Sequence, residues 1–173
     1  AEYLGRYLFA ADFLRSRRQD LVADISCGMG YGTAELAGAA GRAIGVDARR
    51  DLIEAARASF QRDNISFLCK DLEQDDLCPD IEEGGADAVV SFETLEHLLD
   101  PVRALSQFSR ILKPGGFFIC SVPHVQNESG DGSGLPRNRS HKQWFNFSSL
   151  SSLVSGHDMR VIYRLGQSWS RML

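Results

Sequence analysis

Short apolar runs alternate with segments of helical periodicity along almost the whole chain. This alternation is typical of β-α-β units and predicts a mostly parallel sheet. Since 173 residues with 43% hydrophobic content suffice for one core with two covered faces, residues 1–173 are expected to form a single domain with a doubly wound α/β fold. The predicted strands are Leu21–Ser26, Ala43–Asp47, Ile65–Cys69, Ala86–Phe92, Phe117–Val122 and Arg160–Leu165.

The segments between these runs predict helices. A leading helix is expected from Tyr3 to Leu14, and another is expected to start at the N-cap Asp100, with Pro101 in its first position, and to stop at the Lys-Pro-Gly-Gly segment 113–116. The segment Gln126–Arg139, rich in Gly, Ser and Asn, is expected to be a long loop of the kind that forms lids. The side chains expected to face the sheet are Thr33, Leu36, Ala37 and Ala40; Leu52, Ile53, Ala56 and Phe60; and Val102, Leu105, Phe108 and Leu112.

Charge and cysteine spacing exclude several classes of protein. A net charge of −4 provides no field that attracts nucleic acid or an anionic membrane, so the expected partner is a small molecule. No apolar run reaches the roughly 18 residues of a membrane span. The widely spaced cysteines contain no Cys-x-x-Cys pair, which predicts reduced thiols and a cytoplasmic location. Because Ala1 is not a natural start, we expect a piece of a longer chain. The sequence gives no indication of the oligomeric state.

A glycine-rich turn follows the first predicted strand. At Gly28 and Gly30 a ligand can approach bare backbone N–H groups, and Asp47, 19 positions after Gly28, can accept both hydroxyl hydrogens of a ribose. The dinucleotide pattern G-x-G-x-x-G is not met, because Thr33 takes the place of the third glycine. Asp24 would repel a pyrophosphate but could help bind the ammonium of a zwitterionic sulfonium. Charge therefore favours S-adenosylmethionine (SAM) over NAD.

At these residues the chain resembles the class I SAM-dependent methyltransferases, whose first motif reads acid-x-Gly-x-Gly-x-Gly. Ser26 stands where that family has its first glycine. The resemblance continues through Asp71 and the segment 91–98 (Ser-Phe-Glu-Thr-Leu-Glu-His-Leu) over nearly the whole chain. We accordingly expect a Rossmann-like fold with strand order 3-2-1-4-5-6 and an antiparallel strand near the carboxyl end. Since the chain stops at Leu173, that edge can be incomplete.

Carried over residue by residue, the resemblance implies a SAM site. Asp71 would bind the adenine amino group, Leu72 would lie at the ring edge, and Ser91 with Phe92 would present backbone to the methionine end. The complete set implied is Asp24, Ser26, Gly28, Gly30, Asp47, Ala48, Asp71, Leu72, Ser91 and Phe92.

The segment after the fourth predicted strand holds the candidate catalytic residues. A hydroxyl acceptor must lose its proton, and His97 is the best-placed base, with Glu96 beside it. The alternative is that His97 only forms hydrogen bonds at a helix start. The later histidines lie on loops or helix ends.

A metal site is a second interpretation of this segment. In a helix, Glu93, Glu96 and His97 would face the same side and could hold Mg²⁺ or Mn²⁺, with His141 as a later ligand. The pattern resembles the metal site of small-RNA 2′-O-methyltransferases. Because many relatives without metal look the same here, we expect no metal.

The methyl acceptor is the least constrained part of the prediction. The charged residues Arg137, Arg139, His141 and Lys142, followed by Trp144 and Phe145, could bind an anionic or sugar-like acceptor, or could form a solvated loop anchored by its rings. Resemblance to ubiquinone-pathway O-methyltransferases and to bacterial methyltransferases of polysaccharide or O-antigen assembly implies methyl transfer to oxygen of a small molecule or saccharide.

Two rival functions stay open. An NAD(P)-linked oxidoreductase is disfavoured by the glycine mismatch and by the lack of a second catalytic domain. A SAM-binding module that has lost its catalytic activity is compatible with Ser26, but the segment from Glu93 to His97 argues against it.

Overall fold

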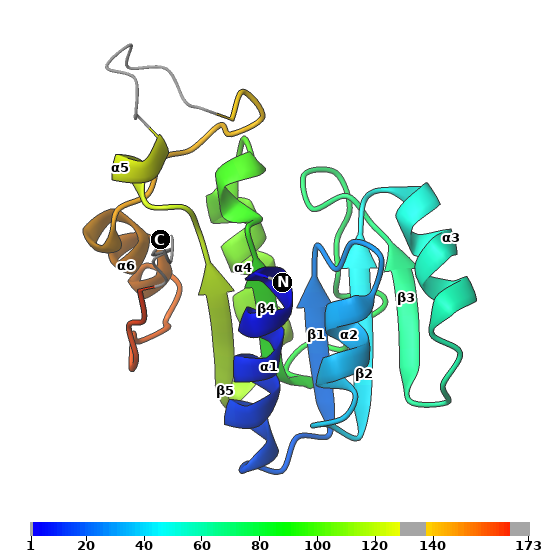
Figure 1. Ribbon diagram of the computed structural model, residues 1–173. Coiled ribbons are helices and arrows are strands. Elements are labelled where there is room, and N and C mark those ends of the chain that lie inside the picture. The colour runs from blue at the N-terminus through cyan, green and yellow to red at the C-terminus, as the bar shows by residue number, and fades with distance from the viewer. Residues whose placement is uncertain (1, 129–137, 167–173) are drawn as a thin grey trace, which may run out of the picture.

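A five-stranded parallel sheet with strand order β3-β2-β1-β4-β5 runs through the molecule (Figure 1). The computed structural model describes residues 2–128 and 138–166. Because the order of successive strands reverses between the neighbours β1 and β4, the carboxyl ends of these two strands border the crevice in which open α/β sheets bind ligands. The strands are β1 (Leu21–Ile25), β2 (Arg42–Asp47), β3 (Ile65–Cys69), β4 (Ala86–Phe92) and β5 (Leu112–Ser121).

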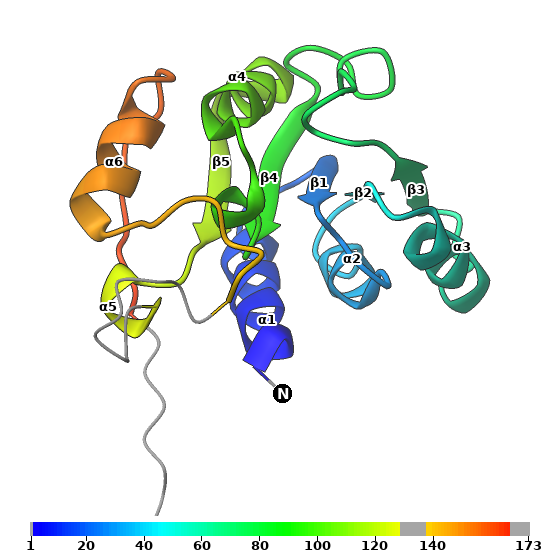
Figure 2. The same ribbon diagram turned by 90° about the horizontal axis from the view of Figure 1, so that it is seen from above.

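Helices cover both faces of the sheet, which confirms the doubly wound α/β fold (Figure 2). One face carries α1 (Glu2–Arg15), α2 (Tyr31–Leu36) and α3 (Arg50–Ser59), and the other carries α4 (Pro101–Ile111), with α6 (Phe147–Ser155) beside it. Two short helical segments follow the carboxyl ends of β4 and β5: η1 (Leu95–His97) and α5 (Val125–Glu128). No helix in these described ranges is long and apolar enough to cross a bilayer.

The alternating side chains of β1 divide the core into two layers. Val22 packs with α1, whereas Ala23 and Ile25 pack with α4, because successive strand residues point to opposite faces. Full burial of a side chain such as Phe108 stabilises the fold by about 1.5–3 kcal/mol. Asp24 shares the α1 face with Val22, which puts a carboxylate inside an otherwise apolar layer.

Helix α4 begins as its sequence predicts. The Asp100 side chain accepts a hydrogen bond from the Arg103 backbone N–H at 2.9 Å, and Pro101 occupies the first turn. Leu105 and Phe108 are buried as expected, but Val102 is 52% exposed, so its predicted inward position is wrong. The buried face includes Ala104, and Val102 lies about 160° around the helix from that residue.

The predicted sixth strand is wrong. The side chains from Arg160 to Leu165 are exposed, and this segment forms no strand, so the described ranges contain no antiparallel edge strand. A strand needs ladder hydrogen bonds to a neighbour. Here the segment makes side-chain contacts instead: Tyr163 packs edge-on against Phe13 of α1, and Arg164 lies over the Phe147 ring.

Other boundaries differ locally from the prediction. Strand β5 starts at Leu112 rather than Phe117: Leu112 pairs with Ala86 and Phe117 with Ala88, and the turn residues 113–116 are accommodated as an irregularity within the strand. Helix α2 ends at Leu36, short of the predicted stripe to Ala40. The expected long loop begins with α5 and ends in a turn at 138–140, and its centre, including Arg137, lies outside the described residues.

Candidate active site

The glycine-rich turn between β1 and α2 has a left-handed backbone at three of its residues. The φ angles are +62° at Ser26, +55° at Gly28 and +81° at Gly30. A Cβ on Gly30 would lie 2.7 Å from the Phe67 ring, so that glycine permits close packing, whereas a Cβ on Gly28 would meet no atom within 4 Å. Gly28 is therefore the position where a ligand can approach the backbone. Ser26 adopts a conformation that costs a non-glycine residue about 1–2 kcal/mol, which explains why a glycine suits this position.

Asp47 ties this turn to the end of β2. Its Oδ2 accepts a hydrogen bond from the Gly28 backbone N–H, and its Oδ1 accepts one from the Arg49 backbone N–H, each at 2.9 Å. Carboxylate oxygens have further lone pairs, so Asp47 can still accept hydroxyl hydrogens. The residue thus both shapes the turn and presents an acceptor beside it.

A small cleft of about 70 Å³ lies at the carboxyl ends of β1, β2 and β3. Five of the predicted cofactor residues line it: Ser26, Asp47, Ala48, Asp71 and Leu72. Val46, Lys70 and Leu98 complete the lining. The sequence prediction missed these three residues. The signal that could have found them is their position in the chain, directly next to Asp47, Asp71 and His97.

Asp71 begins a tight turn after β3. Its Oδ1 accepts from the Glu73 backbone N–H at 3.0 Å, and its Oδ2 accepts from the Gln74 side-chain amide at 2.8 Å. The backbone of Leu72 is held in place by Gln107, whose buried side-chain amide donates a hydrogen bond to the Leu72 carbonyl oxygen. These contacts fix the wall of the cleft that the prediction assigns to adenine.

Asp24 lies beneath the glycine turn rather than in the cleft. The Tyr7 hydroxyl donates to its Oδ1 at 3.0 Å, and the Thr33 hydroxyl donates to its Oδ2 at 2.6 Å. Burial raises the pKa of Asp24 to about 7, although these two hydrogen bonds oppose the shift. A direct contact of Asp24 with a ligand stays a prediction.

This buried carboxyl predicts a pH-dependent stability. Unfolded Asp24 loses its proton near pH 4 and native Asp24 near pH 7, so the native state binds more protons between these values. The free energy of unfolding should therefore fall as pH rises through this window, by about 1.4 kcal/mol per pH unit from this group. Urea unfolding of the wild type and of Asp24→Asn across pH 4–7 measures the difference. Parallel pH profiles of the two proteins would contradict the assignment.

The methionine-side residues Ser91 and Phe92 end β4. Ser91 is fully buried, and its hydroxyl has no hydrogen-bond partner in the described part of the chain. The Phe92 ring packs edge-on against Tyr7 at 4.9 Å. Glu93 follows with φ at +53°, accepts from the Ser121 hydroxyl at 2.7 Å and pairs with Arg6 at 3.4 Å.

The structure separates the four alternative metal ligands. The α-helix on which this alternative depends does not form; η1 begins only at Leu95, and Glu93 turns toward β5 and α1. Glu96, His97 and His141 do come together, with one potential ligand atom of each within 4.8 Å of the others. A metal on these three residues stays an alternative.

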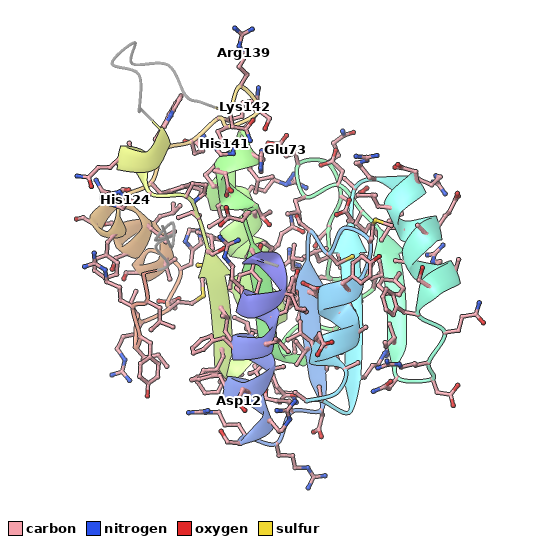
Figure 3. All side chains as sticks on the ribbon, viewed as in Figure 1. Asp12, Glu73, His124, Arg139, His141 and Lys142 are labelled. Atoms are coloured by element: carbon pink, nitrogen blue, oxygen red, sulfur yellow. The ribbon has the colours of Figure 1, made fainter. Side chains whose placement is uncertain are left out.

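His97 and His141 meet because the segment 138–143 folds back over η1. The Lys142 and Gln143 backbone N–H groups both donate to the Glu96 carbonyl oxygen, at 2.6 and 3.0 Å. The two imidazole rings stand edge-to-face at 4.7 Å, and Figure 3 shows His141 above the carboxyl end of the sheet. Residues about 45 positions apart therefore share one site.

The local contacts favour His97 as a base. Its Nδ1 lies 3.4 Å from the Ser140 carbonyl oxygen and 3.2 Å from the Ser140 hydroxyl. Because a carbonyl only accepts, this contact favours a proton on Nδ1 and leaves Nε2 able to take one. The buried Glu96 carboxylate lies 4.0 Å from Nε2, and the imidazole side chain is 39% exposed.

The segment from Arg139 to Phe145 has features of both predicted alternatives: exposed basic and aromatic side chains that could bind an acceptor, and a buried ring that anchors the loop. Arg139 and Lys142 are exposed at the rim (Figure 3), and Trp144 is 48% exposed. Phe145 is buried in the core and anchors the segment. Three exposed side chains thus lie within three residues of His141 in the chain.

Comparison with known proteins agrees with this geometry. Residues 23–120 match the methyltransferase domain family. The chain is 31% identical over 146 residues to a probable S-adenosylmethionine-dependent methyltransferase of Mycolicibacterium smegmatis, covering 84% of this chain and 54% of that protein. It is 32% identical to the ubiquinone biosynthesis O-methyltransferase of Methylococcus capsulatus over 57% of this chain and 41% of that protein. The chain thus spans about half the length of these curated relatives.

A solved structure supports the fold. The N-methyltransferase NodS of Bradyrhizobium japonicum, crystallised with S-adenosyl-L-homocysteine, superposes with a TM-score of 0.66 at 19% identity. The match covers 86% of this chain and 71% of NodS.

Proposed function

Since this chain belongs to the class I SAM-dependent methyltransferases, we propose that it binds SAM in the cleft beside Asp47 and transfers the methyl group to an oxygen of a small-molecule or saccharide acceptor. The observation that carries the proposal is the pairing of Asp47 with the Gly28 backbone at the edge of this cleft. It combines an open approach to a glycine backbone with a carboxylate that can accept ribose hydroxyls.

The residues present suit the parts of SAM. Asp47 would bind the ribose, and Asp71 with Leu72 would face adenine, since all three line one cleft. The glycine turn and the backbone of Ser91 and Phe92 would hold the methionine part. When bound, SAM supplies a methyl group on a positively charged sulfur, which the acidic surroundings favour electrostatically.

His97 is proposed to act on the acceptor. Its Nε2 takes the hydroxyl proton while the acceptor oxygen bonds to the methyl carbon and the carbon–sulfur bond breaks, its electron pair remaining on sulfur. The Ser140 carbonyl holds the Nδ1 proton, and the Glu96 carboxylate stabilises the resulting imidazolium. Alignment of acceptor and methyl group supplies the rest of the rate enhancement.

The rival functions fit these contacts less well. A dinucleotide would place its negatively charged pyrophosphate at the glycine turn, close to the acidic side chain of Asp24. Thr33, which stands at the third glycine position of the dinucleotide pattern, donates its hydroxyl to Asp24 instead. A SAM-binding module without catalytic activity would not need a histidine held by Ser140 beside a buried glutamate.

The acceptor and the cellular location belong to the same proposal. A hydroxyl acceptor agrees with the relative named as a ubiquinone biosynthesis O-methyltransferase, and the exposed Trp144 beside Lys142 suits a sugar or another flat or anionic group. The four described cysteines are free thiols, which suits a reducing cytoplasm.

Ligand-dependent melting tests the cofactor assignment. S-adenosyl-L-homocysteine at about 100 times its Kd should stabilise the native state by about 2.7 kcal/mol. For a domain of this size that corresponds to a rise in Tm of roughly 5–10 °C. A rise in Tm of this size with NAD, together with no rise with S-adenosyl-L-homocysteine, would contradict the proposal.

A further inference from the structure

Helix α1 contacts three separate parts of the proposed cofactor site. Tyr7 reaches Asp24 below the glycine turn, packs against Phe92 at the end of β4 and covers Gly32 in the first turn of α2. One residue earlier, Arg6 pairs with Glu93. All of these contacts come from one turn of a helix that precedes the first strand.

The Tyr7 ring leaves no spare room at the turn. A Cβ on Gly32 would lie 2.1 Å from this ring, so the first turn of α2 is built against the tyrosine. The ring is also nearly buried, at 9% exposure. The position of the α2 amino end, where the glycine turn finishes, is therefore fixed by α1.

The Tyr7 hydroxyl adds a polar link to this packing. It donates to the same carboxylate that accepts from Thr33, and Thr33 lies on α2 just after the glycine turn. Tyr7, Asp24 and Thr33 thus connect α1, β1 and α2 in one buried network. A displacement of α1 would remove one of the two donors that hold the Asp24 carboxylate.

We propose that Tyr7 is a positioning residue for the cofactor site, which couples the docking of α1 to cofactor binding through its hydroxyl on Asp24. This inference rests on the proposed SAM function. When α1 is docked, it stabilises the conformation of the glycine turn that binds the methionine part of the cofactor. A bound cofactor stabilises the same conformation of the turn, and this conformation is the one against which α1 packs. Such coupling is reciprocal, because each event changes the free energy of the other by the same amount.

The Tyr7→Phe variant removes only the hydroxyl and retains the ring that packs on Gly32 and Phe92. Its affinity for S-adenosyl-L-homocysteine, measured by isothermal titration calorimetry, should be at least about fivefold weaker, the lower end of typical coupling between sites. Tyr163→Phe is the matched control, because Tyr163 also packs on α1, through Phe13, but is 68% exposed. This control should bind with wild-type affinity.

Hydrogen exchange supplies a readout that a loss of stability alone would not reproduce. S-adenosyl-L-homocysteine should slow exchange of the α1 amides in the wild type and in Tyr163→Phe, and this slowing should be largely lost in Tyr7→Phe. In the Asp24→Asn background, Tyr7→Phe should weaken binding much less than it does alone, because both changes break the same link.

The outcomes separate this inference from the proposed function. If the wild type does not bind S-adenosyl-L-homocysteine, the proposed function fails, and the inference fails with it. If the wild type binds, but Tyr7→Phe binds equally well and shows the same slowing of α1 exchange, Tyr7 is a packing residue only and the inference alone is overturned. Equal and additive losses from Tyr7→Phe and Asp24→Asn would also overturn it.

Discussion

Replacement of His97 by alanine is expected to lower turnover about 100-fold or more while the affinity for S-adenosyl-L-homocysteine stays nearly unchanged. The imidazole is not part of the lining of the proposed cofactor cleft and lies next to Ser140 and Glu96, so its loss removes the proposed base and leaves the proposed ribose and adenine contacts in place. The deficit should shrink as pH rises, because hydroxide in the solvent partly replaces the missing base. Steady-state rates on a hydroxyl acceptor, found by screening nucleotide sugars, free sugars and phenols, measure this.

His124→Ala controls for the loss of a histidine near the carboxyl end of the sheet. Figure 3 shows His124 near α5, apart from His141 and the site. In the described part of the chain, the hydrogen bond found for its ring is the one that Nδ1 accepts from the nearby Gln126 backbone N–H. This variant should keep wild-type turnover. Wild-type turnover in His97→Ala as well would make His97 a structural residue. If a chelator abolishes wild-type activity and Mg²⁺ or Mn²⁺ restores it, His97 is a ligand and the metal alternative holds.

The second large effect is expected at Asp47. Alanine at this position removes the proposed acceptor for two ribose hydroxyls and also the hydrogen bond that holds Gly28. Hydrogen bonds to charged groups contribute about 1.5–3 kcal/mol each, so the affinity for S-adenosyl-L-homocysteine should fall about 100-fold or more. Turnover at saturating SAM should change much less, since His97 and its contacts remain. Calorimetric titration and steady-state kinetics together separate these two effects.

Asp51→Ala is the matched control for this change. Asp51 is a carboxylate four residues further along, ion-paired with Arg49 and well exposed, so its removal alters charge near the cleft without touching the glycine turn. It should bind S-adenosyl-L-homocysteine almost as the wild type does. Equal losses in both variants would mean that the general negative charge, and not the Asp47 geometry, governs binding.

Local signals in the sequence determined most of the sheet. The existence of strands β1 to β5 follows from the alternation of apolar runs and helical segments, because a parallel strand buried on both faces needs a continuous apolar run. Their order was expected from the resemblance to the class I SAM-dependent methyltransferases, and the structure confirms it for these five strands. Asp100 and Pro101 set the start of α4 through contacts within a few residues. Likewise, the strand ends and the glycine turn place Asp47, Asp71 and Ser26 at one edge of the sheet, where the structure finds them around one cleft.

Tertiary contacts decided what the sequence could not. The spacing of Glu93, Glu96 and His97 suggested one helical face, but the left-handed turn at Glu93 and its contacts with Ser121 and Arg6 direct it elsewhere. The segment 160–165 also forms no strand, although its residues suit one, because no strand within residues 2–128 and 138–166 pairs with it to supply ladder hydrogen bonds.

The approach of His141 to His97 and of Tyr7 to Asp24 depends on how distant segments dock. Periodicity and capping report interactions over a few residues of chain, whereas these contacts are fixed by the packing of whole elements. Thus the sequence by itself determined the strands of the sheet and the edge at which the cleft lies, and only the folded packing decided which side chains meet there.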